Sequence, residues 1–492
     1  MGKLLLVTGT IAEAETTEVA VGLHADVAVF PVSVALFLTP KAAIKGLKEL
    51  DLSIYEKILF PGLMLGDVSE IENGVGVPCF KGTIQVGDLP RALKKGSELS
   101  KVDAVEALLE KDAKRELKDL FATLEAKEGL FPVGKLKIGP VPRILAEVID
   151  VPRLDKEDIV NQALHYKQTG ADMIDIGAVA GGGNAKKLGD AVSWVKDATG
   201  LPVSIDSLDV EEIKAGIDAG AELVLSLDSS NIGKVDIPSD TACVMLPTDS
   251  SKGIMPKDRI GALLANIEAA KEIGLRKLLA DPILEPAPRF AESLARFKEF
   301  KEKSPVPLFM GVGNVIELID ADSIGMNALL ASAGVELGVA VMLTTEASPK
   351  TLYAVRELKR GLEMALLARA RKSVPKDLGL CLLTAKGKNK GRDIELPADL
   401  VAICARADPG FTRDPKGDFH ICVDFKKKTV IAAHLTDQYD EVIEGGDAES
   451  IWKEIEKKGL VSDKNHAAYL GRELQKAESC LRSGKAYIQD SV

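Results

Sequence analysis

The stretch Gly170-Ala171-Asp172-Met173-Ile174-Asp175-Ile176-Gly177 contains a short apolar run that ends at an acidic residue and a glycine. The same arrangement returns in Leu201-Pro202-Val203-Ser204-Ile205-Asp206-Ser207 and in Leu279-Ala280-Asp281-Pro282. Short apolar runs bounded by Gly and Pro are typical of buried strands. If these strands are parallel, their acidic ends meet at one face of the sheet or barrel, which is the face where parallel barrels carry their active sites.

Between about residues 139 and 371 the same rhythm continues, with strand candidates separated by helix-length amphipathic segments. The candidates are 143–149, 173–176, 203–206, 223–227, 243–246, 277–281, 308–312 and 338–343. Asp155 before the first helix, and Gly200 and Gly220 after the next two, are typical helix-boundary residues. Eight such units in about 230 residues match a TIM (β/α)8 barrel, which we therefore predict over 139–371.

The two flanking regions predict separate domains, so that the chain as a whole is α/β. Residues 1–130 alternate strands (4–7, 26–30, 57–60) with helices (13–23, 40–50), as in a Rossmann-like parallel sheet. The charged stretch from about 98 to 128 predicts a solvated connecting helix. Residues 376–492 predict a small α+β domain with strands at 378–383, 400–404 and 419–423, a loop at 386–392, and helices at 448–458 and 465–482.

Composition narrows the classes of partner. The chain has 492 residues, with 63 Lys and Arg against 74 Asp and Glu, and this net charge of −11 repels a nucleic-acid backbone. The apolar run at the N-terminus is too short for a signal peptide or a membrane span. The six cysteines form no C-x-x-C pair, so we expect reduced thiols, a cytoplasmic location and no metal centre. From the net charge and the short apolar run, we expect neither a nucleic-acid nor a membrane partner.

Several polar residues fall at or just past the predicted strand ends, where a barrel binds its ligand. They are Asp175, Asp206, Ser226, Asp228, Asn231, Asp281 and Asn314. Each could instead cap a following helix, and this alternative stays open for any one of them. Together, the carboxylates suit a ligand with ring N–H and amino donors, because a buried carboxylate needs hydrogen-bond donors.

In order and spacing, the segments 170–177, 201–207, 219–223 and 279–282 together resemble the pterin-binding family. That family includes dihydropteroate synthase, the pterin-dependent corrinoid methyltransferases, and a barrel component of the corrinoid iron-sulfur protein. The resemblance implies a reduced pterin of the tetrahydromethanopterin or tetrahydrofolate type. It further implies that Asp206 and Asp281 hold the pterin ring, with Asp175 in support.

The departures from the family pattern bear on the reaction. The synthase has an Asn-Val-Thr-Pro-Asp-Ser-Phe loop, a Ser-Thr-Arg-Pro loop, a Ser-Arg-Lys strand end and an Arg-x-His motif. This chain has 147–153, 180–184, 311–314 and 343–346 in their places, and so lacks the cations that would stabilise a departing diphosphate. Asn314 is similar to the methyltransferase residue that hydrogen-bonds pterin N5, which makes it the candidate catalytic residue for methyl transfer to or from N5.

Two alternatives stay open. The first is a diverged dihydropteroate synthase, in which the backbone of 181–183 with Lys186 and Lys187 would form a phosphate nest. The second is a non-catalytic pterin or corrinoid carrier that docks on a corrinoid protein or methyltransferase; a homodimer is a further expectation.

The C-terminal region resembles the cytoplasmic corrinoid-binding part of the archaeal tetrahydromethanopterin methyltransferase, on the segments 414–419 and 463–474. The resemblance makes an archaeal source and a corrinoid cofactor expectations of the sequence. His466 opens a predicted helix and is the candidate corrinoid ligand, because imidazole suits such metals. A histidine that only packs at a helix start is the alternative.

Overall fold

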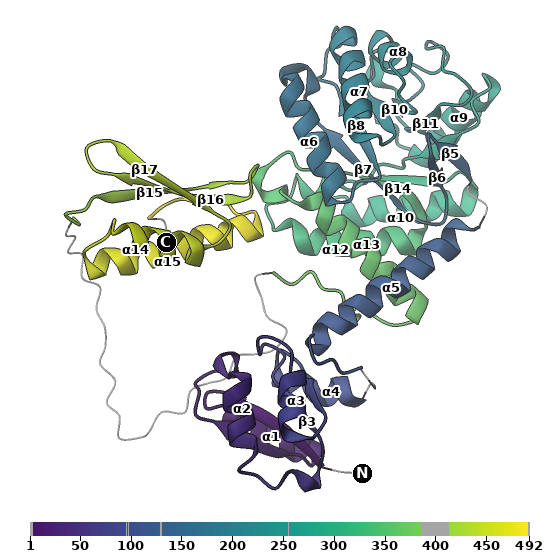
Figure 1. The fold of residues 1–492 in the computed structure, drawn as a ribbon. Coiled ribbons are helices and arrows are strands. Elements are labelled where there is room, and N and C mark those ends of the chain that lie inside the picture. The colour runs from purple at the N-terminus through teal and green to yellow at the C-terminus, as the bar shows by residue number, and fades with distance from the viewer. Residues whose placement is uncertain are drawn as a thin grey trace. The chain divides into compact units, whose positions relative to one another are not determined.

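The computed structural model describes residues 3–94, 96, 98–127, 130–253, 255–384 and 413–490. Its contacts divide the chain into two compact units, Met1–Lys127 with Glu363–Cys381, and Glu128–Leu362 with Leu382–Val492. Figure 1 shows the elements of each part, which are described in turn.

The N-terminal part contains a parallel sheet with the strand order β2-β1-β3-β4. The strands are β1 (Lys3–Gly9), β2 (Asp26–Phe30), β3 (Tyr55–Phe60) and β4 (Cys79–Lys81), and the helices are α1 (Glu13–Leu23), α2 (Pro40–Leu47), α3 (Ser69–Val75) and α4 (Leu89–Lys94). Both faces of the sheet are covered by apolar clusters, one around Leu5, Val7 and Phe60 and the other around Leu6 and Leu59. Alternate residues of β1 therefore serve opposite faces, as the period of a strand requires.

Helix α5 (Val105–Glu125) differs from the solvated connecting helix that its charge pattern predicts. Ala113 and Leu117 are buried in an apolar cluster with Leu367 of α13 (Ala354–Arg371) and with Leu378 and Leu380. The predicted strand at 378–383 is wrong for the same reason, since this segment has no strand hydrogen bonding and instead places its leucines against the helices. An apolar run of this length cannot by itself distinguish a strand from a packed irregular segment.

The predicted (β/α)8 barrel is confirmed. Eight parallel strands close in the order β10-β11-β12-β13-β14-β7-β8-β9 (Figure 1). They are β7 (Arg143–Val148), β8 (Met173–Gly177), β9 (Val203–Asp206), β10 (Leu223–Leu227), β11 (Ala242–Met245), β12 (Leu278–Ala280), β13 (Leu308–Gly311) and β14 (Val339–Thr345). The intervening helices are α6 (Lys156–Thr169), α7 (Ala185–Thr199), α8 (Val210–Asp218), α9 (Arg259–Glu272), α10 (Phe290–Lys303), α11 (Gly313–Ile316) and α12 (Ser323–Leu337).

The helix boundaries follow the residues that predicted them. The Asp155 carboxylate accepts a hydrogen bond from the Asp158 amide at the start of α6, and Gly200 ends α7 in a left-handed conformation that glycine adopts without strain. One unit lacks its helix, because residues 228–241 between β10 and β11 form turns.

A short hairpin, β5 (Phe131–Val133) and β6 (Leu136–Ile138), covers one end of the barrel. Val133 and Ile138 join the interior cluster that contains Leu145, Met173 and Leu279. Gly134 in its turn lies against the Glu222 carboxylate, which directly precedes β10. The hairpin therefore lies at the amino-terminal end of the strands and leaves the carboxyl-terminal end for ligands.

The C-terminal part pairs an antiparallel sheet, β15 (Asp418–Asp424), β16 (Thr429–Leu435) and β17 (Tyr439–Gly445), with helices α14 (Ala448–Lys458) and α15 (Lys464–Ser483). These elements share one apolar core and agree with the predicted strand at 419–423 and the two predicted helices. The predicted loop at 386–392 and strand at 400–404 lie outside the described residues. Among the described helices, none combines the length and apolar character needed to cross a membrane.

Candidate functional site

The carboxyl-terminal end of the barrel brings three carboxylates together on neighbouring strands. Asp175 on β8 stands opposite Glu147 on β7, and Asp206 on β9 stands opposite Gly177. Leu145 and Met173, two residues earlier on their strands, lie in the barrel interior, so Glu147 and Asp175 also point inward. One oxygen of each of the three carboxylates lies within 4.8 Å of the others.

The sequence interpretation included Asp175 and Asp206 but not Glu147. Gly177, the last residue of the opening motif, shows how close this glutamate comes, because a Cβ there would stand 2.5 Å from Glu147 Oε1. The period-two pattern of β7, which places position 147 on the same face as Leu145, was the signal that could have identified it.

Two serines hold the aspartates in place. The Ser204 hydroxyl donates to Asp175 Oδ1, and the Ser226 hydroxyl donates to Asp206 Oδ1 over 2.5 Å. Ser226 has a φ of 66°, a left-handed conformation that is strained for a residue with a side chain. Asn231 supports it by donating from Nδ2 to the Ser226 carbonyl oxygen over 3.1 Å.

The surroundings of these carboxylates favour their neutral forms. Burial, followed by the charges of Asp206 and Asp150, raises the pKa of Glu147 to about 8. Burial and the charges of Asp206 and Glu147 raise the pKa of Asp175 well above its usual range. Burial also raises the pKa of Asp206, although the Ser226 hydrogen bond acts in the opposite direction. A ligand that brings hydrogen-bond donors or positive charge would therefore stabilise the ionised forms of these three carboxylates.

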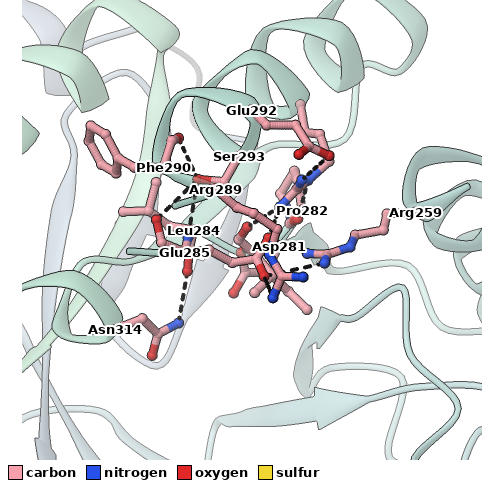
Figure 2. Close-up of polar contacts among 12 residues, drawn as sticks. Arg259, Asp281, Pro282, Leu284, Glu285, Arg289, Phe290, Glu292, Ser293 and Asn314 are labelled. Atoms are coloured by element: carbon pink, nitrogen blue, oxygen red, sulfur yellow. Dashed lines mark hydrogen bonds and ion pairs between the residues drawn. The ribbon is translucent and has the colours of Figure 1, made fainter. Parts of the chain in front are cut away.

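Asp281 follows β12 and is 6% exposed. Its Oδ1 accepts a hydrogen bond from the Ile283 amide over 2.8 Å. Burial raises the pKa of Asp281 to about 7, against the smaller opposing effects of the Ile283 hydrogen bond and the Arg296 charge. Asn314 is exposed on α11, and its Nδ2 lies 3.5 Å from the Leu284 carbonyl oxygen in the segment that follows Asp281 (Figure 2).

A cavity of about 610 Å³ opens at the same end of the barrel, beside β8, β9, β10 and β11. Asp206 and Ser226 line it, together with the loop 178–182 and residues 246–255 in part. Asp281, directly after β12, and Asn314, on α11 after β13, lie outside this lining. The predicted site residues thus form one group around Asp206 and a second around Asp281.

Comparisons with known proteins agree with this architecture. A family model described as "Pterin binding enzyme" matches residues 150–344, and one described as "PterinBD-DUF4346" matches residues 413–490. Uncharacterized protein MJ0107 of Methanocaldococcus jannaschii is 35% identical over 99% of this chain and 98% of its own length. The chain belongs to the dihydropteroate synthase-related pterin-binding family.

Solved structures of dihydropteroate synthases are similar to about half of this chain. Dihydropteroate synthase of Stenotrophomonas maltophilia is 22% identical, with 48% of this chain and 94% of that chain covered and a TM-score of 0.39. The enzyme of Yersinia pestis is 16% identical, with 49% and 99% covered and the same TM-score of 0.39.

Within this pterin-binding barrel, two of the predicted site residues form internal contacts. Asp228 accepts hydrogen bonds from the Ser230 hydroxyl, the Thr248 hydroxyl and the Ser250 amide. Asn231 Oδ1 accepts from the Asp228 amide over 3.0 Å. These contacts join the loops after β10 and β11 and support Ser226, so both side chains shape the mouth.

Arginines near the pterin-binding barrel's mouth are held by one carboxylate. Glu285 forms ion pairs with Arg259 at 2.6 Å and with Arg289 at 2.9 Å (Figure 2). It also pairs with Arg296 at 2.6 Å. Arg259 and Arg296 are about nine-tenths buried, which fixes the loop that follows Asp281. The sequence did not predict this cluster, because its members are separated by up to 37 positions. Their contact depends on the conformation of the loop that follows Asp281.

The glycine-rich loop of the pterin-binding barrel has an acidic neighbour. A Cβ on Gly182 would stand 2.5 Å from the Asp209 carboxylate. Lys187, which the phosphate-nest alternative requires, stacks over the Trp194 ring at 5.1 Å. A carboxylate beside the loop and a lysine engaged elsewhere both weaken it as a diphosphate site.

In the C-terminal part, His466 lies at the start of α15, with its Nδ1 3.3 Å from Asp414 Oδ2. Burial would raise the pKa of Asp414, but hydrogen bonds from Ser462 and three backbone amides more than offset it and hold this pKa well below its usual range. A carboxylate fixed on Nδ1 is the arrangement that orients a metal-binding histidine toward its ligand through Nε2.

Proposed function

We propose that the barrel binds a reduced pterin of the tetrahydromethanopterin or tetrahydrofolate type and takes part in methyl transfer to or from N5. The observation that carries this proposal is a pair of carboxylates at the mouth of a barrel of the pterin-binding family, the partly exposed Asp206 and the buried Asp281, each with a raised pKa. The amino and ring N–H groups of a pterin supply the donors that such carboxylates need.

In this proposal Asp206 and Asp281 hold the ring and Asp175 supports Asp206. Ser226 sets the Asp206 carboxylate by its hydrogen bond. Asp228 and Asn231 act through the loop that carries Ser226, rather than by direct contact with the pterin. The strained backbone of Ser226 is consistent with a site whose geometry is set by function.

Asn314 is the proposed catalytic residue. When a methyl group leaves N5, the C–N bond breaks, its electron pair stays on nitrogen, and the methyl carbon bonds to a nucleophilic acceptor. A hydrogen bond from the Asn314 amide stabilises the electron pair on N5 without a titrating acid. Among the described residues, its amide makes one long hydrogen bond, 3.5 Å to the Leu284 carbonyl oxygen, which leaves the amide available for this role.

The synthase alternative has less support. A synthase must meet the charge of a departing diphosphate, but Arg259 and Arg296 are committed to Glu285 and Lys187 to Trp194. Calorimetry with a tetrahydropterin and, separately, with hydroxymethyl-dihydropterin diphosphate tests the choice. We expect the tetrahydropterin to bind and Asp206→Asn and Asp281→Asn to weaken it; binding of the diphosphate alone, or unchanged affinity in both variants, contradicts the proposal.

A corrinoid carrier function is the second candidate, favoured by the Asp414–His466 contact. In this alternative the C-terminal part presents His466 Nε2 to cobalt, and a corrinoid protein or methyltransferase is the partner in the cytoplasm. Residues 1–130, 139–371 and 376–492 then act as three functional domains. Purified protein mixed with cobalamin should show an imidazole-bound spectrum that His466→Ala loses and His420→Ala keeps, since His420 is exposed and bonded to Tyr439. Absence of cobalamin uptake by the unmodified chain contradicts this candidate.

A further inference from the structure

The three carboxylates of Glu147, Asp175 and Asp206 form a compact oxygen cluster. Each comes from a different strand of three that are adjacent in the barrel, β7, β8 and β9. One oxygen from each lies within 4.8 Å of the others. Because strands of a closed barrel are rigid, the convergence of these oxygens is set by the fold.

Asp175 provides an independent indication that something is bound there. Its Oδ2 is buried and has no hydrogen-bond partner among the described residues, although Asp175 is 0% exposed. Its Oδ1 is already engaged by the Ser204 hydroxyl. A buried carboxylate oxygen without a partner carries a desolvation cost that a ligand could remove.

Among the described residues, none of the three carboxylates forms an ion pair with a lysine or arginine. The charges that act on Glu147 are those of Asp206 and Asp150, and the charges that act on Asp175 are those of Asp206 and Glu147. Asp281 differs, because the Arg296 charge acts on it. The main charges that act on Glu147 and Asp175 are thus those of other acids.

We propose that Glu147, Asp175 and Asp206 bind a divalent cation of the hard, oxygen-preferring class. Two oxygens on one ion can be separated by at most twice the metal–oxygen distance, which is roughly 4.2 Å for Mg²⁺ and about 4.6 to 5.2 Å for Ca²⁺. Each pair of oxygens in the cluster lies within 4.8 Å, which is below the upper limit for Ca²⁺, and a contraction brings the pairs within the magnesium limit. Carboxylate oxygens without imidazole or thiolate ligands favour Mg²⁺, Mn²⁺ or Ca²⁺ over zinc.

The surroundings give such an ion an entry path. Asp206 lines the cavity at the barrel mouth, and Glu147 and Asp206 keep part of their surface exposed. Water or a ligand in the cavity can complete the coordination, since these cations take six or more oxygens. This site goes beyond the proposed pterin binding and shares only Asp206 and Asp175 with it.

Mn²⁺ titration of the full chain, followed by electron paramagnetic resonance of the free ion, tests the proposal. We expect the unmodified protein to remove Mn²⁺ from solution, Ca²⁺ or Mg²⁺ to displace it, and both Glu147→Gln and Asp175→Asn to lose this bound ion. Asp281→Asn is the matched control, because it removes a buried carboxylate of the same mouth outside the cluster, and it should keep the ion.

Thermal unfolding provides a second readout. Mn²⁺ should raise the Tm of the unmodified chain and of Asp281→Asn, but not that of Glu147→Gln, since binding to the native state alone stabilises it. Without metal, Glu147→Gln should be at least as stable as the unmodified chain, because it removes one of three facing acids. Failure of the unmodified chain to bind Mn²⁺, or equal binding by Glu147→Gln, overturns the proposal. Either result can be distinguished from a failure of the proposed pterin binding, because the effect of Asp281→Asn on pterin affinity is measured separately.

Discussion

The Ser226 hydroxyl donates a 2.5 Å hydrogen bond to Asp206 Oδ1 from a backbone whose φ is 66°. The fold therefore places a strained residue where its side chain can fix a carboxylate of the candidate site. Alanine removes the hydrogen bond and keeps the backbone strain, whereas glycine removes both, because only glycine adopts a left-handed backbone without strain.

Ser226→Ala and Ser226→Gly should separate these two effects. Both variants lose the hydroxyl, so the pKa of Asp206 rises further and pterin affinity falls by about tenfold, the loss of one hydrogen bond to a charged group. The glycine variant should unfold with a free energy roughly 1 kcal/mol above that of the alanine variant, because its backbone is relaxed. Urea denaturation and calorimetry measure the two quantities. Equal stability of the variants would show that the left-handed backbone carries no strain.

Asp281→Asn should change how stability depends on pH. The pKa of Asp281 is about 7 in the native state, above its value near 3.9 in the unfolded chain. The native state thus holds this proton more tightly, and the corresponding stability is complete below about pH 4 and lost as pH rises through 7. The loss amounts to roughly 4 kcal/mol as an upper bound.

The variant lacks this loss, because its amide does not ionise. We expect Asp281→Asn and the unmodified chain to have similar free energies of unfolding near pH 4, with the variant more stable by a few kcal/mol at pH 8. Denaturant titrations across this range measure the difference. A constant offset between the two proteins at all pH values would contradict the raised pKa.

Pterin affinity should depend on the same proton. The ionised Asp281 carboxylate accepts hydrogen bonds from ring N–H and amino donors, while its protonated form offers fewer acceptors. With a pKa of about 7, roughly a tenth of the free protein is ionised at pH 6, so the Kd should be about tenfold higher there than at pH 8. Asp281→Asn should bind weakly, with a smaller change over this range. An affinity of the unmodified chain that does not vary with pH would exclude Asp281 as a pterin ligand.

The sequence predicted the barrel strands well because each combines a buried apolar run with a glycine or an acid at its end. The observed β8 and β9 differ from their predicted ranges by at most one residue. Helix α5 and the segment 378–383 were harder, since their leucines are buried against each other across more than 200 residues of chain. Charge patterns and short apolar runs indicate local secondary structure, and they do not predict packing between segments that are distant in the sequence.

The site was predictable where strand ends determine it and less so where loops do. Asp175, Asp206 and Ser226 meet because their strands are neighbours. Glu147 lies opposite Asp175 on the neighbouring strand, but it was not predicted because its segment differs from the family's pattern. Asp228 and Asn231 resemble ligand-binding residues in sequence, yet their hydrogen bonds are taken up within the loop, which only the path of that loop reveals.

Glu285→Gln should destabilise the protein and weaken the site that Asp281 belongs to. The substitution leaves the guanidinium groups of Arg259 and Arg296, which are 10% and 9% exposed, without their shared carboxylate. Breaking a buried ion pair in this way costs about 3 to 5 kcal/mol, because the remaining charges stay desolvated. Glu292→Gln is the matched control: Glu292 also pairs with Arg296, but it is 69% exposed and its removal should leave stability almost unchanged. Urea denaturation gives the free energies of unfolding and calorimetry the pterin affinity. Because Glu285 orders the loop that carries Asp281, its loss should weaken pterin binding as well, whereas equal effects of the two substitutions would mean that the arginine cluster does not hold this loop.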